Sequence, residues 1–254
     1  MARKLYVGGN WKMNLHHSEV EALVKGLVEK ITDDSVQVTV FPAFPYLAQV
    51  AVQLCAANCK TIAVGAQDFY FENNGAFTGE VSLSMLKDVG VKVVLVGHSE
   101  RRHVIGECDE LLNKKVLAGL AAGMEVVLCV GEKLEQREAG KTDAINAGQI
   151  SLGLAGVTAE QMSQVTIAYE PVWAIGTGKT ATPADAQNAH AAIRKHLANL
   201  YGQAVADGVR IQYGGSVKPG NAKELFGQPD IDGGLIGGAA LKTEDFVGII
   251  TAGQ

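Results

Sequence analysis

The sequence has few cysteines, few prolines and no long apolar run. Four cysteines in 254 residues are too few for a disulfide scaffold, and no CxxC pair suggests a redox centre. The longest apolar runs, such as residues 93–96, are far shorter than the roughly 18 residues of a membrane helix. We therefore expect buried free thiols and no contact with a membrane.

Charge of either sign is also scarce. Charged residues make up 19% of the chain, and 22 basic against 27 acidic residues give a net charge of -5. With 47% apolar residues, this balance is typical of a folded chain with a sizeable core and excludes intrinsic disorder. No basic face suggests nucleic acid. The first residues lack the apolar stretch of a secretory signal, so we expect a cytoplasmic protein.

Short β-branched runs predict eight parallel strands. They lie at residues 5–7, 36–41, 61–64, 91–96, 126–130, 165–168 and 209–213, with a weaker eighth at 235–236. Segments with helical spacing alternate with them, including residues 183–193 after the expected N-cap Thr182. An open doubly wound sheet and a closed barrel both fit, but eight units in about 250 residues is the typical barrel. No linker interrupts the series, so we predict an α/β chain with one (β/α)8 barrel domain over residues 1–254.

Polar residues and glycine pairs follow these strands, where barrels hold their chemistry. Glycine is abundant, at 30 residues, and the pairs after the last two strands let backbone N–H groups approach a phosphate. A small phosphorylated substrate is the first hypothesis. The residues concerned are Asn10, Lys12, Gln67, Asp68, His98, Ser99, Glu100, Glu170, Gly214, Gly215, Ser216, Gly237 and Gly238.

Glu170 is the strongest single candidate. It ends an apolar strand and precedes Pro171, where a carboxylate is neither a helix-face charge nor a cap. We expect partial burial to raise the pKa of Glu170 toward the range of a general base. Lys12 alone fits a solvated lysine and His98 alone a structural histidine, so the hypothesis depends on their joint occurrence.

Two other motifs do not support a different chemistry. The run Gly178-Lys179-Thr180 resembles the end of a P-loop, but Trp173 stands where that motif needs its first glycine. His98, Glu100, His103 and Cys108 are grouped like metal ligands, yet the PCxxC partner of zinc deaminases is absent. We therefore expect neither a nucleotide site nor a metal site.

Five segments together resemble the triosephosphate isomerases in order and spacing. They are residues 10–14, 96–102, 168–178, 213–216 and the pair Gly237-Gly238, and the resemblance spans essentially the whole chain. It implies a barrel enzyme that interconverts dihydroxyacetone phosphate and glyceraldehyde 3-phosphate with no cofactor and no metal. A barrel aldolase and a noncatalytic phosphate-sugar binder remain alternatives, although Lys12 lies beside Asn10 and Trp11 rather than on a strand as a Schiff-base lysine would.

The resemblance also implies roles for individual residues. Glu170 would move a carbon-bound proton, and His98 would polarise the carbonyl as a neutral imidazole, a role for which this family is itself the standard example. Lys12 and Asn10 would stabilise negative charge, with Glu100 and Ser99 supporting them. The loop of residues 171–180 would close over the substrate, with Ile175 and Leu235 clamping Glu170. The expected substrate-binding residues are Gly176, Ser216, Leu235, Gly237 and Gly238.

One segment predicts a subunit interface. Residues 67–79 begin at Gln67, end at Gly79 and carry four aromatic residues, which are costly to expose on a monomer. Packing against the chain's own barrel is one explanation. The resemblance instead implies a homodimer in which this loop reaches the partner, with Thr78 near the partner's site. The sequence departs from the family at Leu15, where glycine is common, and at Ala240, where serine is frequent.

Overall fold

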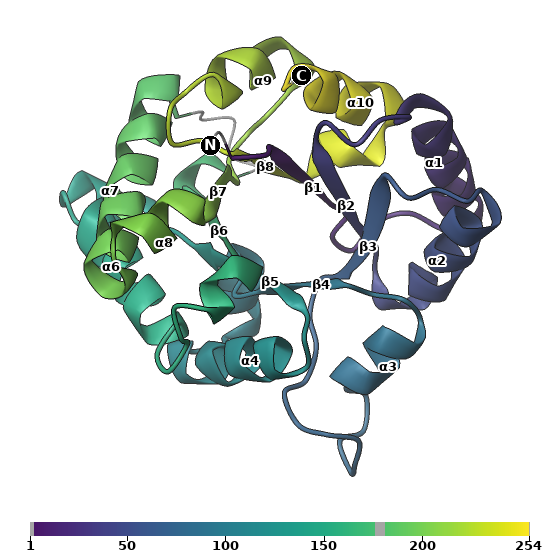
Figure 1. Cartoon of the computed structure of the whole chain (residues 1–254), viewed down its shortest axis with the longest axis horizontal. Coiled ribbons are helices and arrows are strands. Elements are labelled where there is room, and N and C mark those ends of the chain that lie inside the picture. Colours follow the sequence, from purple (N-terminus) through teal and green to yellow (C-terminus); the bar gives the residue numbers. More distant parts are fainter. Residues whose placement is uncertain (1–2, 176–180, 254) are drawn as a thin grey trace.

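The computed structural model describes residues 3–175 and 181–253, and its centre is a closed barrel of eight parallel strands (Figure 1). Each strand pairs with its neighbours in sequence, and β1 also pairs with β8, so that Tyr6 lies opposite both Gln37 and Gly233. This closure confirms the predicted barrel and excludes the open sheet. The strands are β1 (Tyr6–Asn10), β2 (Gln37–Phe41), β3 (Ile62–Ala66), β4 (Val93–Val96), β5 (Glu125–Val130), β6 (Val165–Tyr169), β7 (Arg210–Tyr213) and β8 (Gly233–Ile236).

Helices surround the barrel (Figure 1). The longest is α7, which begins after Thr182 as predicted, because the Thr182 hydroxyl accepts a hydrogen bond from the Asp185 N–H at 3.1 Å. The helices are α1 (His17–Lys30), α2 (Leu47–Ala56), α3 (Leu83–Asp88), α4 (Asp109–Ala121), α5 (Leu134–Glu138), α6 (Thr142–Gly153), α7 (Pro183–Tyr201), α8 (Gln203–Gly208), α9 (Pro219–Phe226) and α10 (Thr243–Thr251), with short turns at Phe44–Tyr46, Arg101–Ile105, Gln161–Gln164, Val172–Ala174 and Gly238–Leu241.

The core has two layers because alternate strand residues point to opposite faces. On β4, Val93 and Leu95 belong to the cluster inside the barrel, whereas Val94 and Val96 face the helices. Cys129 lies in the inner cluster and is buried. All four cysteines are free, as expected, but the expectation that they are buried is wrong for Cys55 and Cys108, which are exposed.

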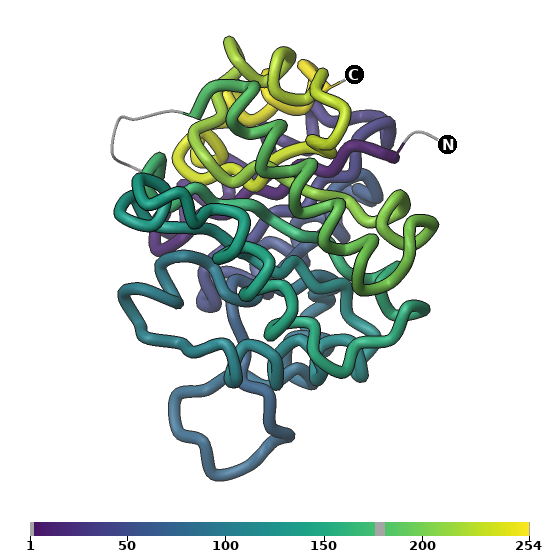
Figure 2. The backbone as a smooth tube through the Cα atoms, turned by 90° about the vertical axis from the view of Figure 1, so that its left-hand side faces the viewer, coloured from purple at the N-terminus to yellow at the C-terminus, as the bar shows by residue number. Residues whose placement is uncertain are grey.

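Residues 67–79 lie in a loop that protrudes from the barrel next to α3 (Figure 2). Phe69 is fully buried in the chain's own core, while Phe77 remains 40% exposed. The ring of Tyr70 contacts Phe71 and Phe77 at centroid distances of 4.7 and 4.8 Å. One aromatic residue therefore anchors the loop to the barrel, and the others stiffen its projecting part. Within the described residues, none of the helices combines the length and apolarity needed to cross a membrane.

Candidate active site

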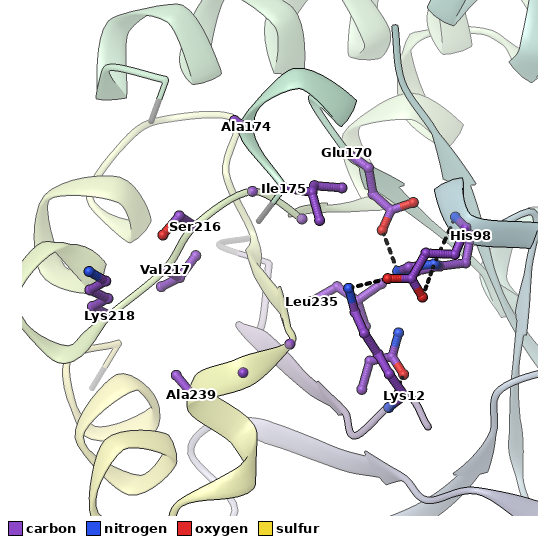
Figure 3. A pocket seen from close by; sticks show the side chains of 16 residues that line it. Lys12, His98, Glu170, Ala174, Ile175, Ser216, Val217, Lys218, Leu235 and Ala239 are labelled. Atoms are coloured by element: carbon purple, nitrogen blue, oxygen red, sulfur yellow. Dashed lines mark hydrogen bonds and ion pairs between the residues drawn. The ribbon is translucent and has the colours of Figure 1, made fainter. Parts of the chain in front are cut away.

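A cavity of about 410 Å³ lies where the strands end (Figure 3). It brings together nine of the residues predicted for catalysis and substrate binding, although they come from five different strand ends. Gln67, Asp68 and Ser99 do not line it, and Gly176 lies outside the described residues. The nine are Asn10, Lys12, His98, Glu100, Glu170, Ser216, Leu235, Gly237 and Gly238, and the cavity is further lined by Ala174, Ile175, Gly214, Gly215, Val217, Lys218 and Ala239.

The side chains of Glu170 and His98 meet at one side of this cavity (Figure 3). Glu170 follows β6, and its Oε1 lies 2.9 Å from Nε2 of His98, which follows β4. The other carboxylate oxygen accepts a hydrogen bond from the Ser99 N–H at 2.8 Å. Both side chains are almost fully buried, so an acid–base pair faces the cavity with little access to bulk water.

The pKa of Glu170 is shifted in the direction opposite to the expectation. Burial is the largest single influence and raises this pKa, but the His98 imidazole, the Ser99 N–H and the Lys12 ammonium together outweigh it. The pKa of Glu170 therefore lies below its ordinary value, and the expected rise is wrong. The compensating groups lie after β4 and β1, so the residues around Glu170 in the sequence give no sign of them.

The same contact acts on His98. Burial alone would lower the pKa of the imidazole, but the carboxylates of Glu170 and Glu100 outweigh burial and raise it. On the other side of the ring, Nδ1 accepts the Glu100 N–H at 3.3 Å. An accepting Nδ1 leaves the ring proton on Nε2, which points at Glu170 and the cavity. The Glu100 N–H is thus compatible with the neutral His98 imidazole that the resemblance implies. The Glu170 carboxylate, in contrast, favours the protonated imidazolium.

Lys12 reaches the cavity from the loop after β1. Its backbone is left-handed, with φ of 53°, and its N–H donates to Oδ1 of Asn10 at 3.0 Å. A left-handed conformation is unfavourable for a residue with a side chain, so the Asn10 contact helps to hold it. The ammonium group then reaches Oε1 of Glu100 at 2.6 Å.

Glycines at the ends of β7 and β8 allow the backbone to approach the site closely. A Cβ on Gly214 would lie 2.7 Å from Cγ of Glu170, and one on Gly237 would lie 3.4 Å from Cε of Lys12. Any residue with a side chain at position 214 would therefore displace Glu170. Ala240, the second departure from the family pattern, is fully buried behind this segment and does not line the cavity.

A buried carboxylate that the sequence did not reveal fixes the start of the predicted lid. Oε1 of Glu132 accepts hydrogen bonds from the Tyr169 hydroxyl at 3.1 Å and from Nε1 of Trp173 at 2.9 Å. The Arg137 guanidinium lies over the Trp173 ring, 4.4 Å from its centroid. These residues are up to 41 positions apart. Residues 176–180 of the lid lie outside the described residues.

The loop after Lys12 carries the predicted departure at Leu15, whose φ of 73° is left-handed. This is the conformation that glycine adopts at no cost, so the departure strains the turn. Met13 beside it is 94% exposed. The loop borders a surface groove of about 510 Å³, lined by Met13, Asn14, Leu15, His16, Glu19, Ala43, Pro45 and Tyr46.

Some lining residues were not predicted. Val217, Lys218 and Ala239 carry no motif of their own, and their only sequence signal is proximity to the glycine pairs. In the part of the chain that the structure describes, no group of three or more histidine, cysteine, aspartate or glutamate side chains is placed to hold a metal ion, and His103 and Cys108 do not line the cavity.

Comparisons with known proteins agree on one family. A family model described as triosephosphate isomerase matches residues 5–253. Curated proteins named triosephosphate isomerase are similar over nearly the full length. The protein from Carboxydothermus hydrogenoformans is 55% identical over 98% of both chains. The one from Chlorobium phaeobacteroides is 50% identical over 98% of this chain and 99% of the relative, and the one from Treponema denticola is 51% identical over 97% and 98%.

Proposed function

The chain belongs to the triosephosphate isomerase family, and we propose that it interconverts dihydroxyacetone phosphate and glyceraldehyde 3-phosphate with Glu170 as the base. The observation that carries the assignment of residues is the buried contact between Glu170 and His98 at the edge of a cavity that also holds Lys12. A carboxylate can remove a proton next to a carbonyl, and an N–H donor and a cation can stabilise the negative charge that enolisation places on the oxygen.

The reaction moves one proton between two carbons and a second proton between the two oxygens bonded to them. Glu170 takes the first from the carbon next to the carbonyl, which leaves negative charge on the oxygen, and returns it to the neighbouring carbon. His98 passes the hydroxyl proton from one oxygen to the other, so that the carbonyl and the hydroxyl exchange places. Nε2–H of His98 and the Lys12 ammonium stabilise the negatively charged oxygen, because preorganised donors act strongly where water is scarce. Asn10 holds the Lys12 backbone, and Glu100 holds both the Lys12 ammonium and Nδ1 of His98.

Substrate binding changes the strength of the base. Since Glu170 and His98 are 2.9 Å apart, a substrate that reaches both must separate them. His98 lowers the pKa of Glu170, whereas burial raises it. When substrate separates the two side chains, the contact with His98 that lowers the pKa of Glu170 is lost, while the burial that raises it remains. The Glu170 carboxylate therefore becomes a stronger base once substrate is bound. Loss of the Glu170 carboxylate contact equally favours a neutral His98 imidazole.

The glycine ends of β7 and β8 are the proposed phosphate site. Ser216, Gly237 and Gly238 line the cavity, and Ser216 lies on the side away from Glu170 (Figure 3). Their backbone N–H groups are of the kind that binds phosphate oxygens. Leu235 and Ile175 line the cavity as apolar residues and are proposed to exclude water around Glu170. Gly176, from the segment outside the described residues, is proposed to contribute a further N–H.

The assembly is proposed to be a homodimer joined by the loop of residues 67–79. Its Phe77 is exposed in the single chain, as is Met13 beside the 510 Å³ groove, and apolar exposure of this kind is typical of an interface. The occupant proposed for the groove is the same loop of a second copy. Residues 1–254 are proposed to be one catalytic domain. A cytoplasmic location is supported by the four free cysteines.

The test is isomerisation of glyceraldehyde 3-phosphate by the purified protein in buffer with a chelator, beside Glu170→Gln. We expect fast turnover and a loss of about 100-fold to 10,000-fold in kcat for the variant, the range typical of a removed general base. Circular dichroism of both proteins controls for folding. No turnover by the folded wild type would overturn the function. Equal turnover by Glu170→Gln would overturn the role of Glu170.

A further inference from the structure

Among the residues that the structure describes, two lysines line the cavity, Lys12 and Lys218, and their electrostatic surroundings differ. Lys12 is paired with Glu100 at 2.6 Å, so its charge is largely offset. Lys218 has no carboxylate within 4.0 Å among the residues that the structure describes. Its side chain is exposed and lies on the side of Ser216, Val217 and Ala239 (Figure 3).

The backbone of Lys218 is fixed by its neighbours. Because Pro219 follows it, extended geometry is favoured at Lys218, and its φ and ψ are -136° and 162°. The Lys218 N–H donates to Oδ1 of Asn221 at 2.8 Å, and Nδ2 of Asn221 donates to the Ser216 carbonyl at 3.1 Å. Asn221 thus links the backbones of Lys218 and Ser216. The backbone from which the Lys218 side chain extends is therefore held next to the proposed phosphate site.

Negative charge around the cavity means that a second cation, in addition to Lys12, would affect the binding of an anionic substrate. The lining carboxylates are Glu100 and Glu170, and the whole chain carries -5. Without Lys218, these two carboxylates would outnumber the single described lysine of the lining, Lys12, and the cavity would repel an approaching phosphate dianion. A cation at the mouth of a cleft raises the local concentration of an anionic substrate and its association rate.

We propose that Lys218 recruits and orients the phosphate group of the substrate at the entrance of the cavity. This proposal rests on the proposed function, because it takes the substrate to be a phosphate ester. Lys218 contacts none of the groups assigned to proton transfer, so it is a positioning residue. It makes the same contribution to the bound substrate and to the transition state, and its loss affects KM rather than kcat.

The test compares Lys218→Gln with Lys25→Gln, which removes the same charge from an exposed position on α1. We expect Lys218→Gln to raise KM by about threefold to tenfold with kcat unchanged, and Lys25→Gln to leave both unchanged. The decrease of kcat/KM with rising ionic strength should be shallower for Lys218→Gln than for wild type. Lys218→Arg keeps the charge and should restore KM.

Inorganic phosphate gives a readout that does not depend on turnover. We expect Lys218→Gln to weaken phosphate binding, measured by calorimetry, by about threefold or more, whereas Lys25→Gln binds as wild type does. If wild type binds phosphate but does not isomerise glyceraldehyde 3-phosphate, the proposed function is overturned. The phosphate-binding measurement still tests the role of Lys218 in that case. If Lys218→Gln matches Lys25→Gln in KM, salt dependence and phosphate affinity, the proposal is overturned.

Discussion

Nε2 of His98 lies 2.9 Å from Oε1 of Glu170, so the proposed base and the proposed electrophile are hydrogen-bonded to each other. A substrate carbon and its carbonyl oxygen must reach both groups, which means that this contact opens before a proton moves. The contact also links the stability of the protein to pH, because it shifts the pKa values of both partners.

The pair should stabilise the fold most between pH 4.5 and 6.5. The pKa of Glu170 is lowered, so its contribution is present above the ordinary value of 4.5 and is lost as the pH falls below it. The pKa of His98 is raised, so its contribution is complete below 6.5 and is lost as the pH rises through the raised value. Denaturant unfolding of wild type and Glu170→Gln should differ most in this window. Glu21→Gln on the exposed face of α1 is the control, and a difference independent of pH would contradict the prediction.

Gly214→Ala should misplace the base. Its Cβ would lie 2.7 Å from Cγ of Glu170, and a displacement of about 1 Å in a catalytic group costs on the order of 100-fold in rate. We expect kcat to fall by about that factor with the far-ultraviolet circular dichroism unchanged. Gly220→Ala is the matched control, since nothing lies within 4 Å of its Cβ. Equal kcat for both variants would show that Glu170 has room to move.

His190 should make the protein sensitive to acid. It is fully buried, and burial lowers its pKa from 6.5 to about 4. A lowered histidine pKa gives stability that is present above pH 6.5 and is lost as the pH falls toward 4, by up to about 3 kcal/mol. His190→Asn should show a smaller fall in unfolding free energy across this range, at fixed protein concentration. His17→Asn, at an exposed position, should keep the wild-type slope.

Phe77→Asp should dissociate the proposed dimer. A charge at an aromatic contact typically costs at least 2 kcal/mol of binding, or about 30-fold in Kd. Sedimentation equilibrium should find wild type at twice the monomer mass of 26.7 kDa and the variant shifted toward that mass. Leu152→Asp places the same charge on α6, at a leucine that is 52% exposed, and should remain dimeric. A wild type that is monomeric at micromolar concentration would refute the assembly.

The eight strands were predictable because β-branched runs mark them, but the first strand was predicted too short. The predicted run ends at residue 7, yet Gly8 and Gly9 both lie in β1. A Cβ on Gly8 would come within 3.1 Å of Leu235 and Phe41, and one on Gly9 within 2.9 Å of Phe246. Glycine at these two positions lets side chains from β2, β8 and α10 pack against β1, a requirement that local sequence does not express.

The membership of the site was predictable, but its electrostatics were not. The polar residues were found because they follow strands, and a barrel brings strand ends together. The pKa of Glu170 is lowered by His98 and then by the N–H of Ser99, which is 71 positions away, and Glu132 holds Trp173 across 41 positions. Such contacts follow from the closed barrel rather than from any local pattern.

The pairing of β1 with β8 means that the two ends of the chain complete one structure. Tyr6 to Gly9 bond with residues 233–236, and Lys12 after β1 lies against Gly237 after β8. During synthesis on a ribosome, β1 can therefore pair with β8 only after nearly the whole chain has been made. The cavity assembles last, so only a finished polypeptide can become active, and an incomplete one exposes an unpaired strand edge.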